Sequence, residues 1–267
     1  MMFVRFCFLF IFFICCGLFS GKSSVFEINN VKIELTGSIE KIPFDFLPGY
    51  ELCDEHIVHA AFTLCYSEKH EQAKWVAYRL TDEMCYDNNE KRSNNFRSDT
   101  AVKTGSASPK DYLKSGYDRG HLCPAGDMGW NVLTMNQSFL MSNMSPQLPA
   151  FNRGIWKRLE SNVREWAKIN NEIYVVTAGV LEDSLPAIGL NNVAVPRYYY
   201  KIILDYKQPV LKAIAFVMLN KESKQSVFDF AVSIDSVEIL TGIDFFPALP
   251  DSLEMFLESN INVGNWN

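Results

Sequence analysis

The hydrophobic and polar positions of this chain alternate mostly with a period of two, which is typical of β-strands. Runs of this kind that are rich in β-branched and aromatic residues predict strands at 25–36, 57–66, 74–80, 172–180, 192–205, 209–219 and 226–232. The polar run 67–73 predicts a hairpin loop between the second and third of these strands. Strand-like residues also surround His121 to Pro124.

A helical period is clearest after Asn152, which stands where a helix N-cap is expected. The apolar residues that repeat at helical spacing are Ile155, Trp156, Leu159, Val163, Trp166 and Ala167. We therefore expect the best helix of the chain to run to about Ile169. Shorter helices are expected at 131–141 and at 233–240, where Ser233 is the cap and Thr241-Gly242 is the stop.

Two segments are predicted to lack regular structure. Residues 142–151 contain two prolines and are expected to be a connector. Residues 81–117 hold few aliphatic side chains and predict a long loop, a feature that is often functional in compact domains. No repeat or linker divides the rest of the chain. The pattern favours a single α+β domain with a mainly antiparallel sheet, over residues 22–267.

The first 21 residues have the features of a secretory signal peptide. Arg5 precedes an uncharged apolar run from Phe6 to Phe19, and small polar residues follow from Ser20. The apolar run is short for a membrane span, so an uncleaved signal anchor is the second interpretation. A mitochondrial presequence would be amphipathic and richer in Arg and Ser. We expect cleavage between Gly17 and Ser23, secretion of the mature chain, and no stable membrane association afterwards.

The cysteines fit the same interpretation. Three of the seven lie in the signal segment, and the mature chain keeps Cys53, Cys65, Cys85 and Cys123. An even number in an exported chain permits two disulfides, in any of three pairings. No spacing among them indicates a zinc site.

Composition narrows the possible functions only a little. The chain has 267 residues, is 48% hydrophobic and carries a formal net charge of −6. That sign argues against a protein that holds nucleic acid by its bulk charge. A local basic site, or an acidic site that recruits a divalent cation to meet phosphate, remains compatible with it.

The stretch from Tyr117 to Pro124 concentrates reactive side chains. It places Asp118, Arg119 and His121 around Gly120. Histidine can accept a proton near neutral pH, and arginine can bind a phosphate with a planar pair of donors. Glycine permits close backbone approach. In isolation the stretch is equally compatible with a surface turn that carries a solvated ion pair.

Three later groups favour a site. They are Ser142-Asn143-Met144-Ser145-Pro146-Gln147, Phe151-Asn152-Arg153-Gly154-Ile155-Trp156, and Leu159-Glu160 followed by Arg164. On a helix, positions 160 and 164 lie on the same face, and 152 lies about two turns toward the N-terminus. The helix thus offers an amide oxygen, a carboxylate and a guanidinium.

With these residues the chain resembles the DNA/RNA non-specific endonucleases, the ββα-metal nucleases. Asp118-Arg119-Gly120-His121 matches the signature of that family, and the groups at 142–147, 152 and 156–160 match its next block. Further matches are Trp75-Val76-Ala77-Tyr78, Thr177-Ala178-Gly179, Val193-Ala194-Val195-Pro196 and Ile234-Asp235-Ser236-Val237-Glu238. The matches occur in the family's order over roughly residues 57–250. This ordered set is far more specific than the tetrapeptide alone.

The resemblance implies a role for each group around the reaction. His121 would be the general base that takes a proton from water. Asn152 would be the direct protein ligand of Mg²⁺, for which Mn²⁺ could substitute. Glu160 would hold water bound to the metal, and Mg²⁺ would stabilise the charge of the transition state.

Other residues would contact phosphate or support the site. By the resemblance, Arg119 contacts phosphate, and Arg164 is a second candidate. The family usually has one more arginine before the signature, which could be Arg92 or Arg97; Arg92 is slightly favoured. Asn143 would support the histidine side of the site, and Asp118 would orient the loop. Cys123 stands where the family often has a small residue, and it would either brace the strand in a disulfide or be an oxidation-sensitive thiol.

Several of these residues also have simpler interpretations. His56, His59 and His70 have no partners at a recognisable spacing and are expected to be structural. Asn152 could be only a helix cap, and Glu160 with Arg164 only a surface pair. The run Tyr198-Tyr199-Tyr200 is expected to pack in the sheet rather than to stack on bases.

We therefore predict a secreted, Mg²⁺-dependent endonuclease that hydrolyses DNA and RNA with little sequence preference and leaves 5′-phosphate ends. Contacts aimed at phosphate carry no base information, which accords with non-specific cutting. The alternative from another class is a nucleic-acid-binding or secreted interaction protein that kept the fold without turnover. A phosphodiesterase for small nucleotides is a further possibility, and the resemblance also allows a homodimer.

Overall fold

A computed structural model describes residues 25–28, 31–34, 46–207 and 210–266, in two units. The first unit ends at Ile39, and in it β1 (Val25–Ile28) pairs antiparallel with β2 (Val31–Glu34). The single strand predicted for 25–36 is therefore wrong, because the segment contains two strands. The predicted signal segment lies outside the described residues. Within the residues described, no helix is both long enough and apolar enough to cross a membrane.

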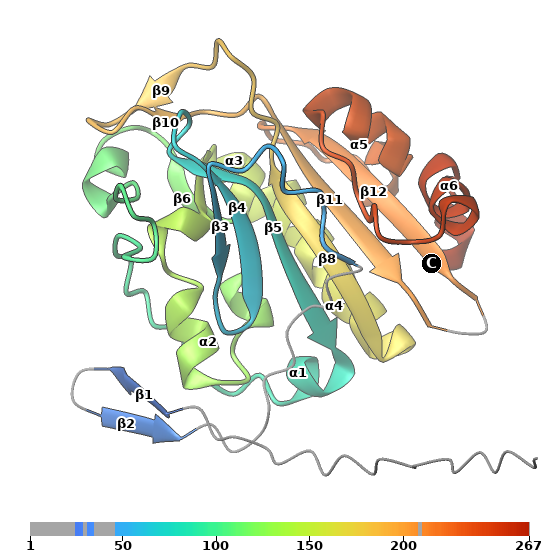
Figure 1. Ribbon diagram of the computed structural model, residues 1–267, viewed down its shortest axis with the longest axis horizontal. Coiled ribbons are helices and arrows are strands. Elements are labelled where there is room, and N and C mark those ends of the chain that lie inside the picture. The colour runs from blue at the N-terminus through green and yellow to red at the C-terminus, as the bar shows by residue number, and fades with distance from the viewer. Residues whose placement is uncertain (1–24, 29–30, 35–45, 208–209, 267) are drawn as a thin grey trace, which may run out of the picture. The chain divides into compact units, whose positions relative to one another are not determined.

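The second unit, Glu40–Asn267, is built on one seven-stranded sheet (Figure 1). All its pairings are antiparallel, as predicted. In spatial order the strands are β13 (Ala231–Val232), β12 (Lys212–Leu219), β11 (Tyr198–Asp205), β8 (Glu172–Gly179), β5 (Gln72–Thr81), β4 (Phe62–Ser67) and β3 (Glu55–Val58).

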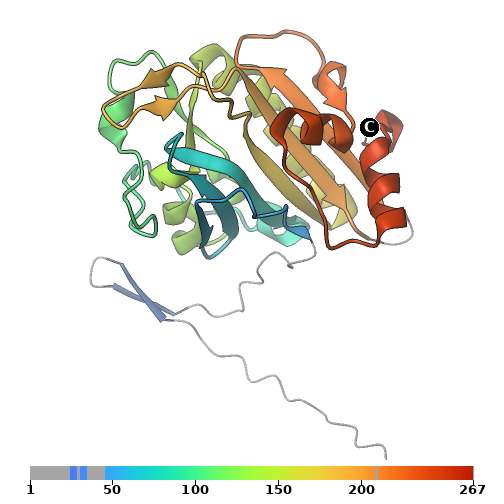
Figure 2. The same ribbon diagram turned by 45° about the horizontal axis from the view of Figure 1, so that its top comes forward.

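Helices cover both faces of this sheet. The helix α4 (Lys157–Asn170) lies on one face, and α5 (Ile234–Thr241) and α6 (Asp251–Ser259) lie on the other (Figures 1 and 2). Side chains of β11 alternate accordingly: Tyr199 packs on Trp156 beside α4, and Tyr200 packs on Phe245 beyond α5. Both tyrosines are fully buried, which agrees with packing and not with base stacking.

The first sheet hairpin differs from the prediction. Residues 57–66 were expected to form one strand, but β3 and β4 pair with each other across a tight turn closed by a hydrogen bond from His59 N to Phe62 O. The turn residues Ala60 and Ala61 are apolar and carry no glycine or proline signal, so the apolar run hid the turn. A disulfide joins Cys53, ahead of β3, to Cys65 in β4.

The predicted connector at 142–151 also proves to be structured. It contains β7 (Met144–Gln147) and the first helical turn, α3 (Pro149–Phe151). Pro146 lies in β7, which belongs to a ribbon of only two strands, where a missing amide donor is tolerated. Two prolines therefore mark a short strand and a helix start, not an irregular segment.

Several shorter elements complete the unit. The long loop at 81–117 holds α1 (Asp82–Tyr86) and the 3₁₀ turn η2 (Pro109–Tyr112), and the predicted helix at 131–141 is α2 (Val132–Gln137). The remaining elements are η3 (Ala125–Asp127), η4 (Met141–Asn143), β9 (Ala187–Ile188), β10 (Val193–Ala194), η6 (Val227–Phe230) and η7 (Val263–Trp266).

Two predicted strands are shorter than expected, and one helix was not predicted. Pro196 and Arg197 separate β10 from β11. Ser226 and Asp229 form a capping box that turns most of 226–232 into η6. The helix α5 begins after Ser233 and stops at Gly242, which adopts a left-handed conformation (φ 69°), as predicted. Nothing in the expected pattern indicated α6.

Candidate active site

A two-stranded ribbon positions the histidine. The strand β6 (Asp118–His121) pairs antiparallel with β7, so that His121 lies opposite Met144 and Gly120 lies opposite Ser145. A Cβ atom at position 120 would collide with the buried side chain of Gln147, so a larger residue there would force that side chain to move. The chain then enters the helical segment through α3, which completes a β-β-α unit.

His121 is almost fully buried, and its environment is aromatic and cationic. Its ring lies edge-on to Phe96 and Phe139, with ring centroids 5.7 and 4.8 Å away. Burial lowers the pKa of His121 to about 3, and the charge of Arg92 acts in the same direction. Its Nε2 atom has no hydrogen-bond partner among the described residues. The imidazole is therefore neutral at physiological pH and has an unused acceptor or donor.

Asn143 braces the segment that follows the histidine. Its Oδ1 accepts a hydrogen bond from Cys123 N at 2.8 Å, and its Nδ2 donates to Cys123 O and Ser138 O, both at 2.9 Å. The side chain is fully buried, and these three bonds use most of its polar capacity. Asn143 thus supports the histidine strand and does not present a group to a substrate. The Cys123 thiol is buried and free, and burial raises its pKa well above the usual value, which opposes reactivity.

Asn152 lies inside the helical segment and not at its N-cap. The cap position is Leu148, and residues 152–156 form a π-helical turn, η5, interrupted at Gly154 (φ −102°, ψ −111°). Such turns often occur at functional sites because they re-aim side chains. The Asn152 Nδ2 donates to Asp118 Oδ2 at 2.9 Å. Its Oδ1 accepts no hydrogen bond from the described residues and stays available as a hard oxygen donor.

Asp118 links the ribbon to the helix. Besides Asn152 it accepts two hydrogen bonds from Arg153, to Oδ2 at 2.9 Å and to Oδ1 at 2.6 Å. Burial would raise the pKa of Asp118, but the hydrogen bonds from Arg153 and Asn152 outweigh it and lower the pKa. The carboxylate is therefore ionised and holds the amide of Asn152 in one orientation.

A cluster of charged and polar side chains links α4 to η3 and β5. Arg164 donates to the fully buried Asp127 at 2.8 Å, and Tyr78 donates to the other oxygen of Asp127 at 2.8 Å. The structure places Arg164 in this internal pair, where it is not free to contact phosphate. The alternative interpretation, a surface pair between Glu160 and Arg164, is not observed.

The charges of Glu160 and Lys201 influence each other beside this cluster. Burial raises the pKa of Glu160 to about 7, against the opposing charge of Lys201. Lys201 is fully buried on β11, its Nζ lies 4.9 Å from the ring centroid of Trp156, and burial lowers its pKa. The positive charge of Lys201 favours the ionised carboxylate of Glu160 and opposes the effect of burial.

The arginines around His121 differ in availability. The Arg119 guanidinium lies 4.0 Å over the ring of Phe96, and that of Arg92 lies 4.8 Å over Phe139. Both rings also contact His121, so both arginines approach the histidine. Arg97 instead donates to two main-chain carbonyls, Asn95 O at 3.1 Å and Asn136 O at 2.9 Å. The geometry thus favours Arg92 over Arg97 as the second arginine of the site.

Comparison with known proteins gives the family. The family model for DNA/RNA non-specific endonucleases matches residues 48–252. The chain belongs to this family. It is 34% identical over 202 residues to the mitochondrial nuclease EXOG of Danio rerio, which covers 70% of this chain and 59% of that protein. It is 31% identical over 201 residues to mitochondrial endonuclease G of Homo sapiens, covering 70% of this chain and 68% of the relative.

The fold comparison agrees. A crystal structure of the EndoG/EndoGI complex matches with a TM-score of 0.70 and 31% identity, over 76% of this chain and 89% of that one. The fold class is therefore that of the family, with a ββα-metal nuclease unit on an antiparallel sheet. The donor set also fits a divalent metal: the Asn152 amide oxygen has no partner among the described residues, which would suit a hard cation that keeps much of its water.

Some residues of the site were missed by sequence reasoning. Asp127, Lys201, Phe96 and Phe139 lie around it but belong to none of the motifs described above. A lysine in the otherwise apolar run of β11 was a usable signal, because a buried lysine requires a partner. By contrast, His59 and His70 are structural as expected: His59 Nε2 is 2.8 Å from Asp99 Oδ2, and His70 Nδ1 is 2.9 Å from Ser67 Oγ.

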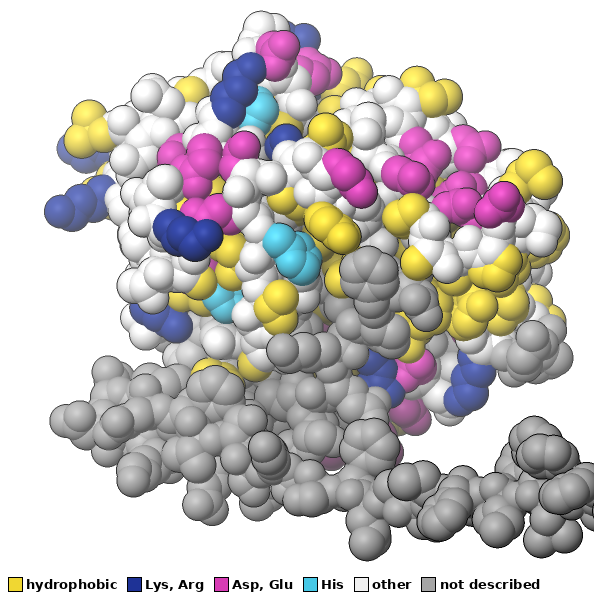
Figure 3. Space-filling view, in the orientation of Figure 1, with side chains coloured by type: hydrophobic (Ala, Val, Ile, Leu, Met, Phe, Trp, Pro, Cys, Tyr) yellow, Lys and Arg dark blue, Asp and Glu magenta, His cyan; other side chains and the backbone are white. Residues whose placement is uncertain are grey.

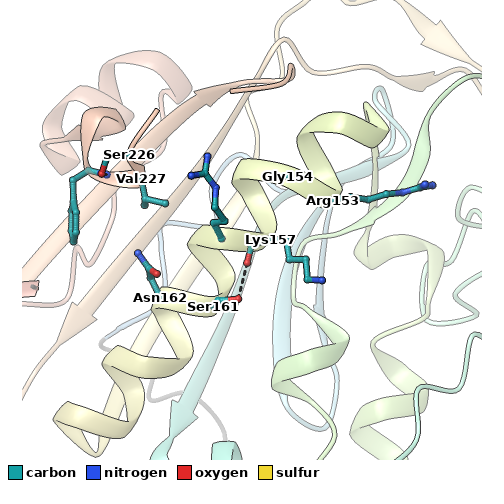
Figure 4. A pocket seen from close by; sticks show the side chains of 9 residues that line it. Arg153, Gly154, Lys157, Ser161, Asn162, Ser226 and Val227 are labelled. Carbon is teal, nitrogen blue, oxygen red and sulfur yellow. Dashed lines mark hydrogen bonds between the residues drawn. The ribbon is translucent and has the colours of Figure 1, made fainter. Parts of the chain in front are cut away.

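A basic groove adjoins Asn152 along the helix. It encloses about 410 Å³ between the first turns of α4 and the turn η6 (Figure 4). Arg153 and Lys157 extend from one side of the helix, while Asn162 lies toward Ser226 and Val227 on the other. The remaining lining residues are Gly154, Arg158, Ser161 and Phe228. Although the whole chain is acidic, this groove gathers three cationic side chains, and one of them, Arg153, also binds Asp118.

Proposed function

We propose that this member of the family is an endonuclease that hydrolyses DNA and RNA with the help of Mg²⁺, with little sequence preference. The observation that carries the proposal is the bond between Asp118 on the histidine strand and Asn152 on the helix. It ties together the general base and the hard oxygen donor, which are the two groups that hydrolysis of a phosphodiester requires.

The roles of the chain's own residues follow from their environments. His121, neutral because it is buried, takes the proton of the attacking water. Asn152 supplies the protein oxygen that would hold Mg²⁺, and Glu160 orders water at the same site. When bound, Mg²⁺ supplies positive charge that stabilises the transition state. Arg119 and Arg92 bind phosphate oxygens, and the face of an aromatic ring fixes each guanidinium.

The basic groove is proposed to hold the strand next to the scissile bond. Lys157 is exposed and forms no ion pair with the described residues, and Arg158 donates only to the carbonyl oxygens of Ser223 and Gln225. Both cations can therefore meet flanking phosphates. Contacts of this kind read no base and raise affinity for longer substrates.

The test is a cleavage assay on purified protein with supercoiled plasmid, ribosomal RNA and a dinucleotide, with Mg²⁺, with Mn²⁺ and with EDTA. Metal-dependent nicking of plasmid and RNA supports the proposal. Binding without cleavage at every metal concentration would favour the turnover-free alternative. Cleavage restricted to the dinucleotide would identify a small-nucleotide phosphodiesterase.

Export and assembly are further proposals. The disulfide between Cys53 and Cys65 supports passage through an oxidising compartment, as the proposed signal peptide at 1–21 requires. The two relatives named above are mitochondrial, so a fluorescent fusion and N-terminal sequencing of the mature chain are the tests. Light scattering tests the homodimer.

A further inference from the structure

Three carboxylates converge on the face of the sheet opposite the nuclease helix. Asp235 and Glu238 lie one turn apart on α5, and Glu258 lies in the last turn of α6, which packs against it. One carboxylate oxygen from each lies within 4.8 Å of the others. Figure 3 shows acidic side chains gathered over these two helices.

Glu258 lacks compensation for its charge. Its side chain is only 6% exposed, and its Oε1 has no hydrogen-bond partner among the described residues. The charged groups that act on it most strongly, Glu238, Glu254, Asp235 and Asp244, are acidic. It also lies at the C-terminal end of α6, where the helix dipole disfavours an anion. A buried carboxylate in such surroundings requires either a proton or a cation.

We propose that Asp235, Glu238 and Glu258 form a second, structural cation site that binds Ca²⁺ and fastens α6 to α5. Carboxylate oxygens are the ligands that hard divalent cations prefer. Three carboxylates from two helices suit Ca²⁺, which accepts six to eight oxygens in variable geometry. Mg²⁺ usually takes one or two carboxylates and keeps its waters. The Phe245 amide donates a hydrogen bond to Oε1 of Glu238 at 2.8 Å, and this bond holds the Glu238 carboxylate in one orientation.

The site is independent of the nuclease centre, since α5 and α6 lie across the sheet from α4. Calcium binding is therefore measured in the Asn152→Ala variant, in which the catalytic metal ligand is absent, by isothermal titration of the EDTA-stripped chain with CaCl₂. We expect one ion per chain with a Kd between about 10⁻⁵ and 10⁻³ M, as for sites of this kind. At 100 times that Kd, calcium should raise Tm by about 5–10 °C.

Two substitutions complete the test. Glu258→Gln keeps the volume of the side chain and removes its repulsion, so it should fold, melt at an equal or higher temperature in EDTA, and lose the calcium-dependent shift. Asp251→Asn, an exposed acid in the first turn of α6, is the matched control and should retain the shift. A chain that shows no calcium-dependent shift, or a Glu258→Gln variant that binds calcium as wild type does, overturns the proposal. Cleavage with Mg²⁺ should be the same in both variants.

Discussion

Asp118 accepts a hydrogen bond from the side chain of Asn152 at 2.9 Å, across 34 residues of sequence. The first residue of the conspicuous Asp-Arg-Gly-His stretch thus serves the helix and not the substrate. Because the Asn152 amide nitrogen is held by a carboxylate, its oxygen is the atom left without a partner among the described residues. Ligands oriented by a second group in this way bind metals more tightly.

This contact predicts a metal-specific defect for Asp118→Ala. Loss of the carboxylate frees the amide of Asn152 to rotate, so the Mg²⁺ concentration for half-maximal cleavage should rise about 10–100-fold. The measurement is the plasmid nicking rate as a function of Mg²⁺. Arg153→Ala is the control, because it removes the ion pair but keeps the bond to Asn152; it should leave the half-maximal concentration within about threefold. Equal Mg²⁺ curves for wild type and Asp118→Ala would show that Asp118 does not orient the ligand.

His121→Ala should remove the general base and leave the fold intact. We expect kcat to fall by about 10²–10⁴, the usual contribution of such a group. Circular dichroism and melting should stay close to wild type, apart from about 1–3 kcal/mol for the cavity left between two rings. His56→Ala, which alters an exposed histidine outside the site, is the matched control. Wild-type cleavage by His121→Ala would mean that the base is another residue.

Substitution of Arg92 should lower activity, whereas substitution of Arg97 should lower stability. Arg92→Ala removes a cation that faces His121, so kcat/KM should fall about 10–100-fold with an unchanged melting temperature. Arg97→Ala removes two hydrogen bonds to carbonyls and should lower Tm by about 2–5 °C while kcat/KM stays within about threefold. A large loss of kcat/KM in Arg97→Ala, with none in Arg92→Ala, would reverse the assignment.

The sequence predicted the family and the fold class, and it offered candidates for the site without the residues that support them. His121, Asn152 and Arg119 could be chosen as candidates because a motif is local and the family's order of motifs is specific. The strand β7 was missed because Pro146 is a local signal against a strand. The turn between β3 and β4 was missed because Ala60 and Ala61 carry no signal for a turn. Arg164 was a second candidate for phosphate contact because its partner in the structure, Asp127, lies 37 residues away in sequence. Burial of Lys201 depends on the registry of three strands, which periodicity alone does not give.

The titration of His121 can be observed directly. Its pKa of about 3 means that the imidazole stays neutral across the physiological range. In metal-free protein with ¹³C-labelled histidine, the His121 signal, assigned by its absence in His121→Ala, should not move between pH 5 and 8. A midpoint near 6.5 would show that the ring is solvated and not held in the aromatic pocket.

The acidic cluster predicts an unusual dependence of stability on pH. Burial raises the pKa of Glu258 to about 8, so between the unfolded value of 4.5 and 8 the folded chain binds more protons than the unfolded one. Without cations the free energy of unfolding should therefore fall as pH rises through this window, by about 2 kcal/mol after allowance for screening. Urea unfolding in EDTA at pH 6 and at pH 8.5 measures this change in the free energy of unfolding. In Glu258→Gln the contribution of Glu258 to the change should be absent. Calcium should restore more stability at pH 8.5 than at pH 6, because it competes with the proton for the same carboxylate; an equal gain at both values would contradict binding at Glu258.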